Sequence, residues 1–133
     1  DYTNETYLKL IHDNYYPEHV LRIPAEDWPE DVSNAFAEIN FPIYLKMQGP
    51  SEFGIVGDAS LKDWDVTSEL NKLEIPFLSI GAEHDTMDPK QMEWMANEVQ
   101  NGLYLHCPNG SHMAMWDDTE NYFDGLINFI KNL

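Results

Sequence analysis

The chain has 133 residues, enough for one domain with a modest hydrophobic core. Its composition, 43% hydrophobic and 13% aromatic, is typical of a globular protein and excludes an intrinsically disordered one. Seven Lys and Arg residues against 24 Asp and Glu residues give a formal net charge of −17, which argues against nucleic acids and anionic membranes as partners.

The first 48 residues are predicted to be mostly helical. The chain enters a helix signal almost at once, with Thr3 as the candidate N-cap, so we expect an interior segment of a longer protein. The helical pattern breaks over residues 12–17, and irregular chain with short helices follows. Helical spacing returns over residues 30–39, and residues 42–47 predict another short helix.

The clearest interruption of the chain is Gln-Gly-Pro-Ser at residues 48–51. It divides the chain into a helical part, residues 1–50, and an α/β part, residues 51–133. A helix is predicted over residues 66–73, and the chain closes with an amphipathic helix that Thr119 is expected to cap. The apolar residues expected to face the sheet from this last helix are Tyr122, Phe123, Leu126, Ile127, Phe129 and Ile130.

Between these two helices lies a strand–helix–strand unit, around which the α/β part is organised. A short apolar run at residues 76–81 predicts a buried strand, and residues 102–107 predict the next one. Asp88-Pro89 is typical of a helix start, with Asp at the N-cap and Pro in the first turn. Strand, helix and strand in this order form a right-handed crossover, so both strands should end at the same edge of one sheet.

Asp85 follows the first of these strands and His112 follows the second. They are 112 − 85 = 27 residues apart, about the length of one crossover, and neighbouring strands lie only about 4.8 Å apart. We therefore expect their side chains to lie within hydrogen-bond distance, about 2.6–3.2 Å. A carboxylate in contact with a histidine fixes the imidazole tautomer and stabilises its cation, as in the acid–base pair of a hydrolase. Taken singly, each residue is an ordinary loop residue.

The sequence offers little sign of other chemistry. It contains no Gly-rich phosphate loop, no basic patch and no cluster of His and Cys with metal-ligand spacing. His106 and Cys107 alternate across a strand and cannot bind one ion from one face. We therefore expect neither a metal nor another cofactor. The single cysteine fits a reducing compartment, so a cytoplasmic protein is expected.

Four stretches occur in a characteristic order and spacing: Met47-Gln-Gly-Pro-Ser-Glu-Phe53, Leu61-Lys-Asp-Trp-Asp65, Gly81-Ala-Glu-His-Asp85 and Asn109-Gly-Ser-His112-Met113. Together they resemble the C-terminal half of the proline iminopeptidases (prolyl aminopeptidases) of the α/β-hydrolase superfamily. The resemblance covers nearly the whole chain. It implies the C-terminal portion of an α/β-hydrolase fold, with parallel strands and flanking helices, preceded by part of a helical cap in residues 1–50.

The same resemblance implies roles for individual residues. Asp85 would be the acid and His112 the base of a Ser-His-Asp triad, and Glu52 would help to bind the free α-amino group of the substrate. A partly buried ammonium needs such a partner, because an unpaired buried charge is costly. Taken without the family, Glu52 is an ordinary exposed carboxylate after a turn.

Thr86 occupies the position where the family commonly has a second Glu that completes the amine site. Glu83 and Asp88 are the alternatives for that role. The resemblance thus implies a small peptide with N-terminal proline as the substrate, while peptides with other first residues and amino-acid amides fit as well.

The Gly-x-Ser-x-Gly nucleophile elbow and the His-Gly-Gly-Pro-Gly oxyanion stretch of the family do not occur in this sequence. Ser111 is no substitute, because it lies on a loop beside the base and not on a strained strand-to-helix turn. We therefore expect a serine-hydrolase fragment that is inactive alone and whose missing N-terminal half carries the nucleophile. Such a fragment should expose more apolar surface than a monomer normally does. The alternatives are an esterase or epoxide-hydrolase-like enzyme and a non-catalytic binding module.

Overall fold

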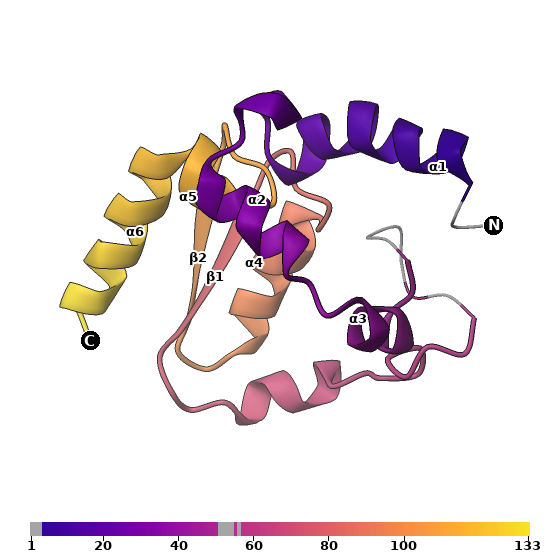
Figure 1. Cartoon of the computed structure of the whole chain (residues 1–133). Coiled ribbons are helices and arrows are strands. Elements are labelled where there is room, and N and C mark those ends of the chain that lie inside the picture. The colour runs from indigo at the N-terminus through magenta and orange to yellow at the C-terminus, as the bar shows by residue number, and fades with distance from the viewer. Residues whose placement is uncertain (1–3, 51–54, 56) are drawn as a thin grey trace.

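The computed structural model describes residues 4–50, 55 and 57–133. Figure 1 shows the whole chain. Its elements, in chain order, are α1 (Glu5–Leu10), the π-helix η1 (Ile11–Val20), the 3-10 helix η2 (Ala25–Asp27), α2 (Glu30–Ala37), α3 (Phe41–Met47), the 3-10 helix η3 (Thr67–Lys72), β1 (Phe77–Ala82), α4 (Pro89–Glu98), β2 (Gly102–Cys107), α5 (Ala114–Asp117) and α6 (Thr119–Lys131).

The centre of the α/β part is a parallel pair of strands, β1 and β2, in which Ile80 is the partner of Leu105. Helix α4 covers one face of the pair and α6 the other (Figure 1). On the α4 face the backbone of Gly102 comes so close to Ala96 that an added Cβ would lie 1.9 Å from the Ala96 carbonyl oxygen. On the α6 face, Gly125 lies directly over Leu105. The predicted crossover between parallel strands is confirmed.

The helical part differs from the prediction at its start. Asn4, and not Thr3, caps α1, since its side chain accepts hydrogen bonds from the amides of the next turn; Thr3 itself lies outside the described residues. The predicted break over residues 12–17 is wrong, because α1 continues without interruption into η1, which contains Pro17. A π-helix pairs each N–H with the carbonyl five residues back, so its wider turn accommodates a proline ring that a tight α-turn would reject.

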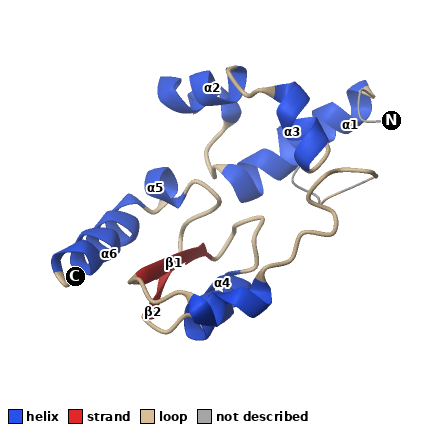
Figure 2. Cartoon of the chain, turned by 90° about the horizontal axis from the view of Figure 1, so that it is seen from below, coloured by secondary structure: helices blue, strands red, loops and turns tan. Residues whose placement is uncertain are grey.

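An aromatic cluster packs η1 against α2. Tyr16, Trp28 and Phe36 lie with ring centroids 5.2–6.2 Å apart, and the indole N–H of Trp28 donates to the carbonyl of Ile23 at 3.0 Å. Aromatic pairs at such distances contribute beyond the area that they bury. Figure 2 shows the result: α1, α2 and α3 gather on one side, and the strands with α4 and α6 lie on the other.

Two helix predictions in the α/β part are also corrected. The helix expected over residues 66–73 is the 3-10 helix η3, over Thr67–Lys72. Thr119 is the first residue of α6 and does not cap it, and Asp118 occupies the N-cap position. The Thr119 hydroxyl instead donates to the carbonyls of Met115 and Trp116, both at 3.1 Å. It therefore supplies a hydrogen-bond donor at the end of α5, where the last carbonyls of a helix have no partner within that helix.

Helix α6 buries only part of its apolar surface. Of the six residues expected to face the sheet, Tyr122, Leu126 and Phe129 are half-buried. The other three are exposed, at 41% for Phe123, 45% for Ile127 and 56% for Ile130. A sheet of two strands is too narrow to cover both flanks of a wide apolar stripe.

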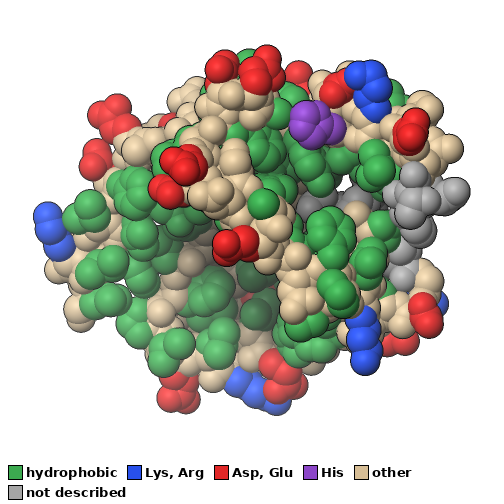
Figure 3. All heavy atoms as spheres, viewed as in Figure 1, with side chains coloured by type: hydrophobic (Ala, Val, Ile, Leu, Met, Phe, Trp, Pro, Cys, Tyr) green, Lys and Arg blue, Asp and Glu red, His purple; other side chains and the backbone are tan. Residues whose placement is uncertain are grey.

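Apolar exposure extends beyond α6, as expected from the sequence. Large hydrophobic side chains of α3 are also exposed, and these are Phe41, Ile43, Leu45 and Met47. Figure 3 shows hydrophobic side chains spread over much of one face of the molecule. Among the described residues, no helix is both long and apolar enough to cross a membrane.

Candidate active site

Asp85 and His112 lie in the loops that follow β1 and β2, at the same edge of the sheet. The imidazole Nδ1 of His112 is 2.9 Å from Oδ1 of Asp85. Because parallel strands end at one edge, the crossover brings together two side chains that are far apart in the sequence. The predicted contact between them is therefore present.

The Asp85 side chain is only 11% exposed, and one of its carboxylate oxygens, Oδ1, accepts several hydrogen bonds. Oδ1 also accepts a hydrogen bond from the Thr86 hydroxyl and one from the Met87 amide, both at 3.1 Å. Burial alone would raise the pKa of Asp85, but the hydrogen bonds from His112, Met87 and Thr86 and the attraction of the imidazole together outweigh it, so the pKa lies below its usual value. Asp85 is therefore ionised at neutral pH.

The ionised Asp85 determines the tautomer of His112. A carboxylate can only accept, so Nδ1 of the imidazole must carry the hydrogen that lies between the two residues. The lone pair of the neutral ring then resides on Nε2. An imidazole oriented in this way can take a proton at Nε2, while the carboxylate stabilises the resulting cation.

The helical part binds both loops of this site. The amide of His112 donates to the carbonyl of His19 at 3.0 Å, and the next amide, of Met113, donates to the carbonyl of Val20 at 2.9 Å. The imidazole Nδ1 of His19 lies 2.9 Å from the carbonyl oxygen of His84, the residue before Asp85. His19 thus contacts both the loop that contains Asp85 and the loop that contains His112. Sequence reasoning missed this residue because nothing local marks a partner 93 residues away.

A hollow of about 220 Å³ lies beside Asp85 and His112. Ile80 and Ala82 of β1 line it, together with Met92 of α4 and Tyr122 of α6. Residues that follow β1 and residues that follow β2 also line it, so the hollow lies at the carboxyl end of the two strands. It gives the histidine ring an open, mostly apolar neighbourhood.

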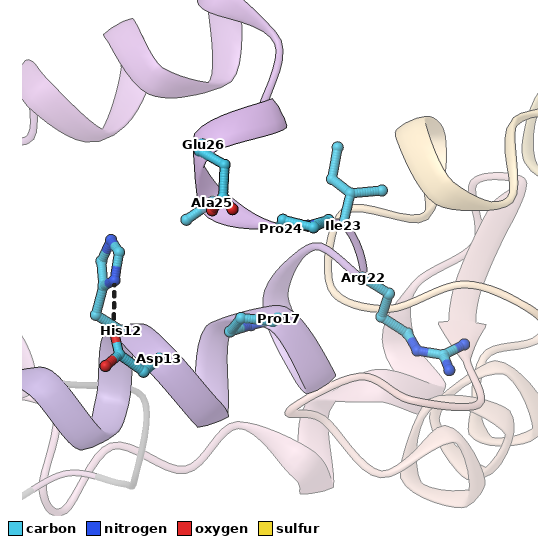
Figure 4. Close-up of a pocket in the computed structure, with 8 residues that line it drawn as sticks. All are labelled: His12, Asp13, Pro17, Arg22, Ile23, Pro24, Ala25 and Glu26. Atoms are coloured by element: carbon cyan, nitrogen blue, oxygen red, sulfur yellow. Dashed lines mark hydrogen bonds and ion pairs between the residues drawn. The ribbon is translucent and has the colours of Figure 1, made fainter.

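A larger hollow, of about 430 Å³, lies on the helical part (Figure 4). Its lining includes His12 and Asp13, neighbours in the chain whose side chains are 3.2 Å apart and exposed. Arg22 also borders it, but its side chain points away and donates to the carbonyl of Asn109 at 3.3 Å. Size alone does not identify an active site. The smaller hollow is the candidate because it borders the largely buried carboxylate of Asp85 with its oriented histidine.

Neither Ser111 nor Cys107 has the surroundings of a nucleophile. Ser111 is fully buried, and its hydroxyl contacts the carbonyl of Val20 at 2.9 Å and the carboxylate of Asp117. Cys107 is fully buried too, and burial, helped by the charges of Asp118 and Asp117, raises its pKa to about 11. A thiol that stays protonated is a poor nucleophile.

We expect the Ser111→Ala variant of the complete protein to lose less than about tenfold in kcat, because the hydroxyl serves the loop and not the reaction. Removal of a true nucleophile costs about 10⁴-fold or more. Steady-state hydrolysis of an ester or anilide by the two proteins measures the difference. A loss of more than 10³-fold in a folded variant would make Ser111 the nucleophile.

The structure describes three of the four residues considered for binding the amine of the substrate. Glu52 lies outside the described residues. The Thr86 hydroxyl donates to Asp85, so in this structure it helps to hold that carboxylate. Asp88 accepts from the Lys90 amide at 2.9 Å as the N-cap of α4, and the Glu83 carboxylate lies 3.6 Å from the imidazole of His106. Their roles toward a substrate stay predictions.

In the part of the chain that the structure describes, no group of three or more His, Cys, Asp or Glu could hold a metal ion.

The chain is similar over its whole length to curated proline iminopeptidases. It is 47% identical over 133 residues to the protein from Elizabethkingia meningoseptica, 47% identical over 133 residues to that from Flavobacterium johnsoniae, and 32% identical over 134 residues to that from Saccharolobus solfataricus. The chain spans less than half of these relatives, with 44%, 43% and 42% of their lengths covered. No protein-family model matches it.

Two solved structures share the fold. The crystal structure of VinJ superposes with a TM-score of 0.85 at 30% identity, over 98% of this chain and 43% of that one. A proline iminopeptidase from Mycobacterium smegmatis gives a TM-score of 0.81 at 28% identity, over 98% of this chain and 42% of that one. The matched region is the C-terminal portion of these proteins, which is the α/β-hydrolase fold class expected from the sequence.

Proposed function

From the similarity of this chain to the C-terminal portion of proline iminopeptidases, which are α/β-hydrolases, we propose that the protein containing it is a serine aminopeptidase. Its substrate would be a small peptide with a free N-terminal proline. The observation that carries the proposal is the 2.9 Å contact between His112 and the largely buried Asp85 carboxylate. Residues 1–50 would belong to the cap over the active site and residues 51–133 to the hydrolase core.

In the proposed reaction, His112 acts as the general base and Asp85 as the acid that orients it. Nε2 of His112 takes the proton of a serine hydroxyl as its oxygen attacks the carbonyl carbon of the substrate, and then gives that proton to the departing amine. Water repeats the sequence on the acyl-enzyme and regenerates the serine. The serine and the oxyanion donors would come from a part of the protein outside this chain. The single cysteine supports placing the protein in the cytoplasm.

A second candidate is an amino-acid amidase, which also needs the free amine, or an aminopeptidase with another first-residue preference. Thr86 favours this candidate, because the neutral side chain stands where the proline iminopeptidases commonly have a second Glu. With fewer carboxylates at the amine site, a strict demand for N-terminal proline is harder to enforce.

A comparison of three substrates tests the proposal on the complete protein: proline p-nitroanilide, N-acetyl-proline p-nitroanilide and alanine p-nitroanilide. An aminopeptidase should prefer the free amine to the acetylated substrate by at least tenfold in kcat/KM, since only the free amine carries a charge for the site to bind. A preference for proline over alanine separates the two candidates. Equal rates on the free and acetylated substrates would reject both and leave a general esterase or amidase.

A further inference from the structure

The loop that leads from β2 to His112 has an unusual set of anchors. At its start, the amide of Asn109 donates to Oδ2 of Asp118 at 3.1 Å, and the carbonyl of Gly110 accepts from the amide of His84 at 3.0 Å. Ser111 follows, fully buried, immediately before His112. Because adjacent Cα atoms are only 3.8 Å apart, whatever holds Ser111 also limits where the imidazole of His112 can lie.

Asp117, the last residue of α5, binds this loop to a distant segment of the chain. Its Oδ1 accepts from the amide of Ser111 at 3.0 Å. Its Oδ2 accepts from the amide of Arg22, 95 residues earlier, at 3.1 Å, and also contacts the Ser111 hydroxyl. One carboxylate thus uses both oxygens on two segments, one beside the base and one in the helical part.

The burial of the neighbouring residues determines how costly it is to lose these hydrogen bonds. Val20 and Leu21, which precede Arg22, are 2% and 0% exposed. Arg22 itself is exposed, whereas Ser111 is fully buried. If the Ser111 amide loses its carboxylate partner, water does not readily replace it, and leaving a buried donor unpaired is costly. The carbonyl of Val20 accepts from the Ser111 hydroxyl at 2.9 Å and from the amide of Met113 at 2.9 Å. The loop of His112 is therefore fastened to residues 19–22 on both sides of the imidazole.

We infer that Asp117 is a positioning residue for His112, because it fastens the loop of the base to the helical part. The inference rests on the proposed function, in which His112 acts as the general base. Asp117 acts through the backbone of Ser111 and needs no contact with the substrate. A displacement of a catalytic group by about 1 Å can reduce the rate about 10²-fold, so a small relaxation of this loop has a measurable effect.

The test is the Asp117→Asn variant of the complete protein. An amide side chain keeps the shape but has one oxygen, so one of the two backbone amides then faces an NH₂ group. We expect kcat to fall about 10- to 100-fold with KM changed less than about twofold. We also expect the ¹⁵N chemical shifts of the His112 ring to move toward a mixture of tautomers, since a displaced ring no longer keeps Nδ1 on Asp85.

The matched control is Asp124→Asn, the same change at an exposed position of α6, which should alter neither kcat nor the His112 spectrum. Unchanged His112 shifts and an unchanged kcat in a folded Asp117→Asn variant would overturn the inference. If that variant fails to fold, Asp117→Glu keeps both oxygens and displaces them by one methylene. Its His112 shifts then decide in the same way. If the native protein hydrolyses none of the substrates, the proposed function fails, but the spectra still report whether Asp117 positions His112.

Discussion

Replacing His112 with Ala in the complete protein is expected to lower kcat by roughly 10³- to 10⁶-fold, because the serine can no longer be deprotonated in place. Asp85→Asn should lower kcat to a similar extent. An amide can present its NH₂ group to Nδ1, which favours the tautomer with hydrogen on Nε2, and the base is then lost. KM should change little, since neither side chain is assigned to substrate binding. Steady-state kinetics on proline p-nitroanilide measures both effects.

The control for this prediction is His12→Ala. His12 lies beside Asp13 as His112 lies beside Asp85, but the pair is exposed and borders the larger hollow. The variant should keep kcat within about twofold of the native value. A large loss with His12→Ala and none with His112→Ala would move the active site to the larger hollow, contrary to the assignment made from burial and tautomer.

Replacing Glu52 with Gln should weaken the action on free-amine substrates by about 2–4 kcal/mol in kcat/KM, roughly 30- to 1000-fold, if the ammonium and the carboxylate meet away from water. N-acetylated substrates carry no charge at that position and should be hydrolysed at an unchanged rate. The comparison of the two substrates on the same variant therefore isolates the amine. Glu120→Gln, an exposed change on α6, serves as the control and should affect neither substrate.

Equal losses on acetylated and free-amine substrates would show that Glu52 supports the fold or the reaction and does not bind the amine. No loss on either substrate would remove Glu52 from the site. In that case Glu83 and Asp88 become the candidates for the amine, and the neutral Thr86 no longer marks an incomplete site. The same measurement thus decides whether Glu52 binds the amine of the substrate or whether Glu83 and Asp88 are the candidates.

The sequence pattern predicted the two strands and helix α4 well, because burial and capping mark each of them locally. Strand β2 has the predicted bounds, Gly102–Cys107, and α4 begins after Asp88 as the Asp-Pro pair indicates. A buried strand or an N-cap is a local event, so its signal lies within a few neighbouring residues. The contact of Asp85 with His112 follows from the same local signals, because a crossover between parallel strands has few ways to form.

The wrong predictions have other causes. The sequence indicated a break before Pro17, but η1 accommodates the proline by widening its turn. Thr119 has the composition of an N-cap, yet its hydroxyl meets carbonyls of the preceding helix. The apolar stripe of α6 is present, but only three of its six residues are half-buried and the other three are exposed. The first case depends on the backbone geometry of η1 itself, and the other two depend on which neighbouring element the side chains meet.

The sequence by itself determined the strands, the crossover and the pairing of Asp85 with His112. These features depend on burial patterns and chain lengths that short stretches of the sequence specify. Only the tertiary structure decided what holds the histidine in place. His19 contacts the loops that contain Asp85 and His112, and Asp117 bridges to Arg22; these contacts join residues 65 to 95 positions apart. A hydrogen bond between segments so far apart leaves no period and no motif in the sequence, because its geometry exists only once both segments have packed.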